Sequence, residues 1–278
     1  MAAAGSVSVI IRARDEAENL RRCLADLRAQ QGVEVLETIY VDTGSADHSL
    51  AVATHSGAAA IEAPRGQPFS FGAALNLGAQ DAVGAVLVAL SAHVVLPDSG
   101  WLARALAALN DPRVACASGD VYGPDGDALT VARDQNAALA RRRPEWGYAN
   151  GAGAFRAELW RQRPFRTDLP GCEDKEWALH WLEHGYVCRV DPALAVGHDH
   201  THDPLRAIYS RARREEQAYT MFLPDRTDYG LGDLARDWWS DLRWYDSAAR
   251  ARVSPRRAAR LLGGYAGRSA GGAAENSR

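Results

Sequence analysis

Two adjacent carboxylates, Glu173 and Asp174, begin a segment, 173–183, with a helical pattern of apolar residues. A carboxylate whose pKa is raised by burial or by a partner can act as a general base, taking the proton from a hydroxyl group as its oxygen attacks. Acids at the start of a helix are also stabilised by the helix dipole without any catalytic task. Taken alone, the pair predicts either a catalytic base or an ordinary helix N-terminus.

A second polar cluster, Asp42–Ser45, follows the apolar run 35–41. A carboxylate at the end of a strand can accept hydrogen bonds from the base or ribose of a nucleotide. Asp-Thr-Gly-Ser is also good turn chemistry, in which case Asp42 caps its own turn. Arg12 and Arg14 follow another apolar run, and their charges either meet a diphosphate or remain solvated.

Histidines offer a third kind of chemistry. Ser91-Ala92-His93 follows an apolar run, and His198, His200 and His202 stand close together. The imidazole of His93 either binds a cation such as Mn²⁺ or contacts a phosphate directly. The late histidines form a metal cluster or a polar loop, and at most two of the three can serve one site.

These clusters need a scaffold, and the sequence predicts one by alternating strand and helix patterns. The predicted strands are 7–11, 35–41, 59–63, 86–90, 114–121 and 187–190. The predicted helices lie between Glu16 and Gly32 and at 49–55, 72–82, 173–183 and 203–222, with one or two more in 231–262 and a helix or mobile loop at 132–143. This alternation predicts a parallel sheet covered by helices, which binds ligands beyond the carboxyl ends of its strands. We therefore expect Arg12–Glu16, Asp42–Ser45 and Ser91–His93 to converge in space.

Composition narrows the class of protein. The 278 residues are 47% hydrophobic and 24% charged, as in a globular α/β domain with additions. The formal charge of −3 argues against a general nucleic-acid binder. The longest apolar run, 82–90, is too short to span a membrane, and residues 1–6 lack the features of a signal peptide. The four cysteines form no CxxC pair, so free thiols and a cytoplasmic location are expected.

The C-terminal part differs in composition from the rest. We expect a domain of residues 1–202, a helical extension of residues 203–262 and a disordered tail of residues 263–278, where Gly, Ala, Ser and Arg dominate. Residues 250–278 carry seven Arg and one Glu, a net charge of +6. This charge suits a solvated tail or a peripheral contact with an anionic membrane. The extension also holds tryptophans expected to pack against the body or a second subunit, as in a homodimer: Trp238, Trp239 and Trp244.

Four segments together resemble the family 2 glycosyltransferases, which have the GT-A fold. They are VSVIIRARDE (7–16), YVDTGSAD (40–47), FSFGAALNLG (69–78) and GCEDKEW (171–177), in the order that the family has them. The resemblance covers about residues 7–202 and implies a Rossmann-like α/β domain with a mixed, mainly parallel sheet flanked by helices. It also implies transfer of a sugar from a nucleotide-diphosphate donor, such as a UDP-sugar, to an acceptor hydroxyl.

The resemblance assigns roles to residues of these segments. Asp174 matches the family's base, which activates the acceptor in a direct displacement with inversion, and Glu173 then orients the loop or the acceptor. The implied donor-binding residues are Arg12, Ala13, Arg14, Glu16, Asp42, Gly44, Asn76, Ser91, Ala92 and His93. Trp177 either stacks on the acceptor sugar or packs in the core, because tryptophan serves both purposes.

One departure from the family pattern concerns metal. The family commonly has Asp-x-Asp where this chain has Ser91-Ala92-His93, and the two carboxylates hold a divalent cation against the donor diphosphate. Serine is a poor ligand, and imidazole suits Mn²⁺ better than Mg²⁺. A late histidine, His200 or His198, matches the position that completes the metal or diphosphate site. The sequence leaves open a divalent cation, Mn²⁺ or Mg²⁺, or direct contact of His93 with the diphosphate.

The resulting prediction is an inverting hexosyl- or deoxyhexosyltransferase of carbohydrate biosynthesis. One alternative is a catalytically inactive protein that binds sugar nucleotides, which the missing Asp-x-Asp favours and the intact acidic pair disfavours. A nucleotide-sugar hydrolase is another alternative. An NAD-binding Rossmann enzyme is disfavoured because no GxGxxG follows the first strand.

Overall fold

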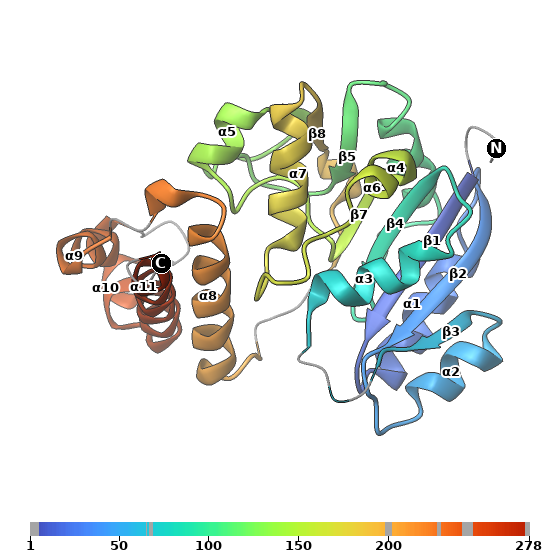
Figure 1. The fold of residues 1–278 in the computed structure, drawn as a ribbon, viewed down its shortest axis with the longest axis horizontal. Coiled ribbons are helices and arrows are strands. Elements are labelled where there is room, and N and C mark those ends of the chain that lie inside the picture. The colour runs from blue at the N-terminus through green and yellow to red at the C-terminus, as the bar shows by residue number, and fades with distance from the viewer. Residues whose placement is uncertain are drawn as a thin grey trace. The chain divides into compact units, whose positions relative to one another are not determined.

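The computed structural model describes residues 6–64, 66, 69–197, 202–226, 229–240 and 247–275. The chain divides into two compact units (Figure 1). One unit runs to Thr167 and resumes at Glu173–His198, and the other combines Asp168–Cys172 with Asp199–Arg278. The α/β fold predicted from the sequence lies in the first unit, and the regular elements described in the second unit are helices.

An eight-stranded mixed sheet is the centre of the first unit. Its strands are β1 (Ser6–Ala13), β2 (Glu34–Asp42), β3 (Ala59–Glu62), β4 (Val86–Ser91), β5 (Val114–Ser118), β6 (Arg133–Gln135), β7 (Ala152–Arg156) and β8 (Val187–Val190). They lie in the order β3-β2-β1-β4-β7-β5-β8-β6. The strands from β3 to β4 are parallel, β7 is antiparallel to both of its neighbours, and β6 is antiparallel to β8. The mainly parallel sheet expected from strand–helix alternation is therefore confirmed.

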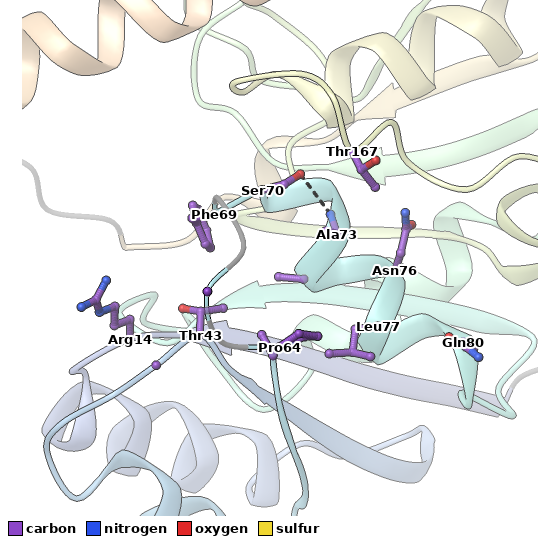
Figure 2. A pocket seen from close by; sticks show the side chains of 14 residues that line it. Arg14, Thr43, Pro64, Phe69, Ser70, Ala73, Asn76, Leu77, Gln80 and Thr167 are labelled. Carbon is purple, nitrogen blue, oxygen red and sulfur yellow. Dashed lines mark hydrogen bonds between the residues drawn. The ribbon is translucent and has the colours of Figure 1, made fainter.

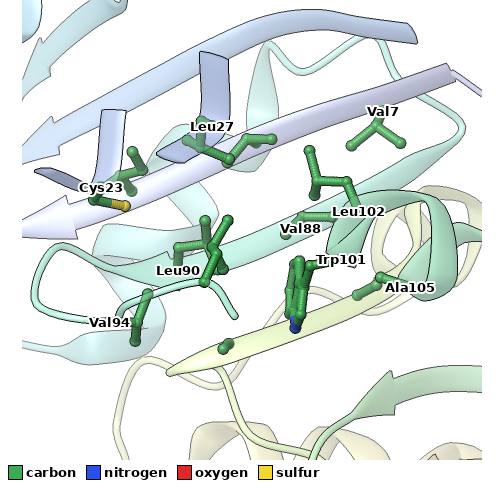
Figure 3. Packing of buried hydrophobic residues seen from close by; sticks show 14 of the residues in the cluster. Val7, Cys23, Leu27, Val88, Leu90, Val94, Trp101, Leu102 and Ala105 are labelled. Carbon is green, nitrogen blue, oxygen red and sulfur yellow. The ribbon is translucent and has the colours of Figure 1, made fainter. Parts of the chain in front are cut away.

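Helices cover both faces of this sheet. They are α1 (Ala17–Arg28), α2 (Ser49–His55), α3 (Phe71–Gln80), α4 (Trp101–Ala108), α5 (Ala137–Arg142), α6 (Ala157–Gln162) and α7 (Glu173–Glu183), with a 3-10 turn at Pro192–Leu194. Alternate residues of β1 point to one face, where they pack with α1 and α4 in a single core. Figure 3 shows Trp101 and Leu102 of α4 in this core beside Val88 and Leu90 of β4.

The opposite face is covered by α3 and by an aromatic cluster around α7. Gly78 allows α3 to approach the sheet, because a Cβ there would lie only 2.6 Å from Ile10 Cγ2. The aromatic cluster joins Trp177 to Tyr148, Phe155 and Phe165, with ring centroids 5.6–6.2 Å from that of Trp177. This face carries the catalytic candidates, because both Glu173 and Asp174 begin α7.

The structure differs from the predicted elements in the middle of the chain. The segment 132–143, expected as a helix or a mobile loop, contains the short strand β6 and the short helix α5. The strand β7 was not predicted, because Ala-Gly-Ala-Phe-Arg has little intrinsic preference for a strand. Its antiparallel pairing with β4 and β5 stabilises the extended conformation that the local sequence does not favour.

The second unit is built on α8 (Leu205–Thr220) and α11 (Pro255–Glu275), with α9 (Leu231–Ser240), α10 (Ala248–Val253) and a 3-10 turn at Pro224–Arg226. The prediction of a disordered tail from residue 263 is wrong for residues 263–275, which are helical. The glycines that suggested disorder allow close packing, because a Cβ at Gly263 would lie 2.4 Å from Tyr209 O and one at Gly267 would lie 2.3 Å from Arg213 O. No helix in the described part of the chain is long and apolar enough to cross a membrane.

The tryptophans of the second unit contact arginines where the structure describes them. The guanidinium of Arg252 lies 4.6 Å from the Trp239 ring, and that of Arg257 lies 5.7 Å from the Trp238 ring. Trp244 lies outside the described residues. The homodimer and the membrane contact stay predictions.

Candidate functional site

The ends of β1 and β4 enclose a small pocket of about 180 Å³. It is lined by Arg12, Ala13, Arg14, Glu16, Thr43, Phe69, Phe71, Ser91 and His93. Six of these residues were predicted as donor-binding, and they lie up to 81 positions apart in the sequence. The convergence expected from the positions of the strand ends is therefore present in the structure.

A second, larger pocket has a volume of about 610 Å³, and Figure 2 shows the residues that line it. Arg14, Thr43 and Phe69 line both pockets, so the two pockets are neighbours. The larger pocket is lined by residues from the ends of β2 and β3 and from α3, including Gly44, Pro64, Leu77 and Gln80, and by Thr167. Its volume is in the range of small-molecule sites.

Asp42 is the last residue of β2, and it is only 4% exposed. Its Oδ1 accepts a hydrogen bond from the Tyr40 hydroxyl at 2.9 Å, and its Oδ2 accepts from the backbone nitrogens of Gly44 at 3.1 Å and Ser45 at 3.0 Å. Burial alone would raise the pKa of this carboxyl, but the hydrogen bonds outweigh burial and lower it. Asp42 thus holds the turn that brings Thr43 and Gly44 to the larger pocket, and it lines neither pocket itself.

Asn76 and Ala92, two further predicted donor-binding residues, have internal positions. Asn76 lines the larger pocket, yet its amide donates to Phe165 O at 2.8 Å and accepts from Trp160 Nε1 at 2.9 Å. It therefore ties α3 to the segment around Phe165. Ala92 is 1% exposed and belongs to the core cluster on the α1 side of the sheet.

His93 is oriented by Glu16 in the small pocket. The His93 Nδ1 lies 3.3 Å from Glu16 Oε1, and both side chains are partly exposed. Glu16 is itself fixed, because its backbone nitrogen donates to Ser49 Oγ at 3.0 Å as α1 begins. The two loops that follow β1 and β2 also hold each other, with Asp15 N donating to Ser45 Oγ at 3.0 Å.

The acidic pair at the start of α7 is joined to the end of β4 through the loop 147–151. Asp174 Oδ2 accepts from the Asn150 backbone nitrogen at 3.0 Å, and Glu173 Oε1 accepts from the Asn150 side chain at 3.2 Å. The carbonyl of the next residue, Gly151, accepts a hydrogen bond from Ser91 N at 2.8 Å. The loop thus positions both carboxylates relative to the strand end that carries Ser91.

The two carboxylates differ in their surroundings. Glu173 is 4% exposed, whereas Asp174 is partly exposed and receives one further backbone hydrogen bond, from Lys175 N at 2.8 Å. Burial raises the pKa of Glu173 to about 7, and the neighbouring charge of Asp174 adds to the effect. Glu173 is therefore partly protonated near neutral pH, while Asp174 keeps lone pairs that its two backbone partners do not use.

The prediction that Trp177 stacks on an acceptor sugar is corrected by its burial. Trp177 is 0% exposed, and its Nε1 donates to Arg163 O at 2.7 Å. A sugar ring cannot reach either face of the indole, since Tyr148, Phe155 and Phe165 surround it. Trp177 packs in the core, which was the other interpretation of the sequence.

The predicted divalent cation can be tested against the ligands that the small pocket offers. These are one carboxylate from Glu16, one imidazole from His93 and the hydroxyl of Ser91, with the guanidinium of Arg12 among them. The described residues contain no group of three or more His, Cys, Asp or Glu side chains placed to hold a metal ion. Among the described residues, this set supplies one carboxylate beside an arginine, whereas the family pattern implies two carboxylates at positions 91 and 93. His198 and His200, the predicted late ligands, lie outside the described residues.

Two residues of the site were missed in the sequence. Asn150 is 1% exposed and bonds to both members of the acidic pair, but only the Gly-rich character of its segment was visible in the sequence. The other residue is Phe71, whose ring centre lies 4.5 Å from the guanidinium carbon of Arg12. Neither contact is encoded by a local spacing, because each joins residues more than 20 positions apart.

The family comparison matches the larger part of the chain. A model of the family described as Glycosyl transferase family 2 matches residues 8–173. A TPR repeat-containing protein of Synechococcus elongatus is 39% identical over 100 residues, which are 36% of this chain. The chain spans only 23% of the length of that curated relative.

Solved structures with a similar fold are glycosyltransferases of low sequence identity. A mannosyltransferase from Pyrobaculum calidifontis, solved with GDP-Man and Mn²⁺, is 20% identical with a TM-score of 0.64, covering 98% of this chain and 86% of its own. A glucosyl-3-phosphoglycerate synthase from Mycobacterium tuberculosis, solved with phosphoglyceric acid, is 19% identical with a TM-score of 0.58, covering 78% and 79%. The likeness identifies the fold as GT-A, as the sequence predicted.

Proposed function

The chain belongs to glycosyl transferase family 2, and we propose that it transfers a sugar from a nucleotide-diphosphate sugar to an acceptor hydroxyl with inversion. The observation that carries the proposal is the joining of two adjoining pockets at the strand ends to a pair of carboxylates through one short loop. A donor site and a base are the two things that this chemistry requires. We propose a hexose or deoxyhexose as the transferred group.

The donor occupies both pockets in this proposal. The nucleoside lies in the larger pocket, where Gly44 and Thr43 approach it with backbone and hydroxyl groups and where Leu77 offers an apolar wall. The diphosphate lies in the smaller pocket, against Arg12 and His93. The similar structures contain GDP-Man or UDP, so a guanosine or uridine diphosphate is the first donor class to examine.

Asp174 is the proposed general base. The acceptor oxygen attacks the anomeric carbon, its proton passes to Asp174, and the bond from the anomeric carbon to the diphosphate oxygen breaks with its electron pair left on that oxygen. Asn150 N and Lys175 N fix the carboxylate at 3.0 Å and 2.8 Å, so its remaining lone pairs have a set direction. Glu173 is the positioning group, because the same asparagine bonds to it.

Glu16 holds His93 in this scheme. With Nδ1 of His93 directed to Glu16, the ring is fixed at the wall of the smaller pocket. A protonated imidazole there would neutralise part of the charge on the leaving diphosphate.

The test has two independent parts. A thermal-shift screen with UDP, GDP, ADP and dTDP measures donor binding, since a ligand that binds only the folded state raises its melting temperature. A second assay follows release of nucleoside diphosphate from the sugar nucleotide that binds best, with and without a library of hydroxyl acceptors. Release that depends on an acceptor supports the proposal. Equal release without acceptor indicates a nucleotide-sugar hydrolase, and binding without release indicates an inactive sugar-nucleotide-binding protein.

A further inference from the structure

Arg12 occupies an unusual position in the smaller pocket. Strand register pairs Arg12 of β1 with Ser91 of β4, so the arginine stands beside the first position of the Ser-Ala-His segment. Pairs in register project their side chains to the same face of a sheet, so Arg12 and Ser91 face the same side. The family pattern implies a carboxylate at position 91, and here a cation adjoins a neutral hydroxyl instead.

The guanidinium of Arg12 is held in place but is not satisfied by the protein. Its carbon lies 4.5 Å from the centre of the Phe71 ring, which restrains the plane of the group. Its Nε is buried without a hydrogen-bond partner. Across the described residues, Arg12 forms no ion pair with a carboxylate, whereas Arg14, the other arginine that lines the pocket, pairs with Asp15.

The neighbouring acids do not neutralise most of the positive charge of Arg12. Burial and the charge of Asp174 raise the pKa of Glu173 to about 7, although Arg12 opposes that rise, so Glu173 carries only part of a negative charge at neutral pH. Glu16 is shared between His93 and the amide of Asn19. The charged residues of the pocket wall are therefore two arginines and one carboxylate, a balance that favours an anion.

From this arrangement we propose that Arg12 binds the diphosphate of the donor directly and replaces the divalent cation, so that donor binding and transfer require no metal. The inference rests on the proposed function. A guanidinium is permanently charged, and its planar set of donors fits two phosphate oxygens at once. When the bond to the anomeric carbon breaks, the electron pair stays on the diphosphate oxygen, and Arg12 stabilises the added charge. No proton leaves the arginine in this step.

Calorimetric titration with UDP and GDP tests the inference on the full chain. Binding by the unaltered protein should be the same in excess EDTA and in added Mn²⁺ or Mg²⁺. Arg12→Met should weaken binding about ten- to a hundredfold, because it removes charge-assisted hydrogen bonds. Arg12→Lys should lose less, since it keeps a point charge. Arg21→Met is the matched control, because Arg21 is an exposed arginine of α1 that pairs with Glu18 and should leave binding unchanged.

A rescue variant separates loss of charge from loss of fold. Combining Arg12→Met with Ser91→Asp and His93→Asp restores the two carboxylates of the family pattern, and nucleotide binding should return only when Mn²⁺ is added. Melting temperatures of all variants report whether the fold is intact. Binding by the unaltered protein that disappears in EDTA would overturn the inference while leaving the proposed function in place. Unchanged binding by folded Arg12→Met would do the same. Absence of any nucleotide binding, with or without metal, would overturn both.

Discussion

Two aspartates that the sequence singled out equally, Asp42 and Asp174, have different relations to the protein around them. Asp42 is buried at the end of β2, and a hydroxyl and two backbone nitrogens already occupy its oxygens. Asp174 is partly exposed at the start of α7, with one backbone donor on each oxygen. A buried carboxylate whose oxygens are hydrogen-bonded within the protein supports the backbone of a site. A partly exposed carboxylate with unused lone pairs can contact a substrate. The same reasoning distinguishes Asn76, which is bonded internally, from Arg12, which is not.

The largest effect should come from Asp174→Asn. The amide cannot take a proton from the acceptor, so the rate of transfer should fall about 10²–10⁴-fold while nucleotide affinity stays within about twofold. Steady-state rates and calorimetric titration of the same preparation measure the two quantities. Near-normal turnover would remove Asp174 from the role of base, and a loss of this size in Glu173→Gln with little change in Asp174→Asn would move the role by one residue.

An effect of intermediate size is expected from Glu173→Gln, seen in the pH dependence of stability. The pKa of Glu173 is about 7 in the fold, against 4.5 for the unperturbed group, so the folded state binds the proton more tightly than the unfolded state. The unaltered protein should therefore lose stability as pH rises from about 4.5 through 7, while the glutamine variant should not. Above pH 7 the free energy of unfolding of the variant should exceed that of the unaltered chain by about 3 kcal/mol.

Urea unfolding across this pH range provides the measurement. Below about pH 4.5 both proteins are neutral at position 173 and should be similarly stable. A stability difference that does not change with pH would show that Glu173 is not the titrating group.

The smallest effect, and the one that tests the comparison most directly, should come from Asp42→Asn. An amide has one acceptor oxygen, so either the Tyr40 hydroxyl or the turn nitrogens of Gly44 and Ser45 lose their partner, at a cost of about 1–3 kcal/mol. The pKa of Asp42 is lowered in the fold, so its stabilisation is present at neutral pH and is lost as pH falls through the folded value.

Asp42→Asn and Asp174→Asn form a matched pair of isosteric substitutions. Thermal unfolding should detect the first, and the rate of transfer should detect the second. If Asp42→Asn left stability unchanged and weakened nucleotide binding more than tenfold, Asp42 would contact the donor directly, as the family resemblance implies.

Most of the sheet and the convergence of its strand ends could be predicted from the sequence. The strands β1, β2 and β4 are continuous apolar, β-branched runs, and such runs depend little on context. Parallel order then requires their carboxyl ends to meet, which brings Arg12, Glu16 and His93 together. The strand β7 and the last helix, α11, could not be predicted in this way, because alanine and glycine acquire their structure there from close tertiary packing.

Individual roles within the site were less accessible to sequence analysis. Trp177 has the residue type of a sugar platform, but whether a ring is covered depends on what the fold places around it. Asn150 bonds to residues 23 and 24 positions away, a relation that no local motif carries. A motif therefore identified the region of the chemistry, and the hydrogen-bond partners of each side chain distinguished supports from candidates for contact.

The loop 147–151 has a consequence for how this protein could be redirected to other donors. It links the end of β4 to both carboxylates, so a substitution at Asn150 should disturb the strand end at the smaller pocket and the acidic pair together. The wall of the larger pocket, by contrast, includes Leu77, Gln80 and Thr167, none of which is bonded to that loop. In a directed-evolution experiment, variants that gain a new nucleotide preference and keep their turnover rate should have substitutions among these wall residues. Their loop 147–151 should be unchanged.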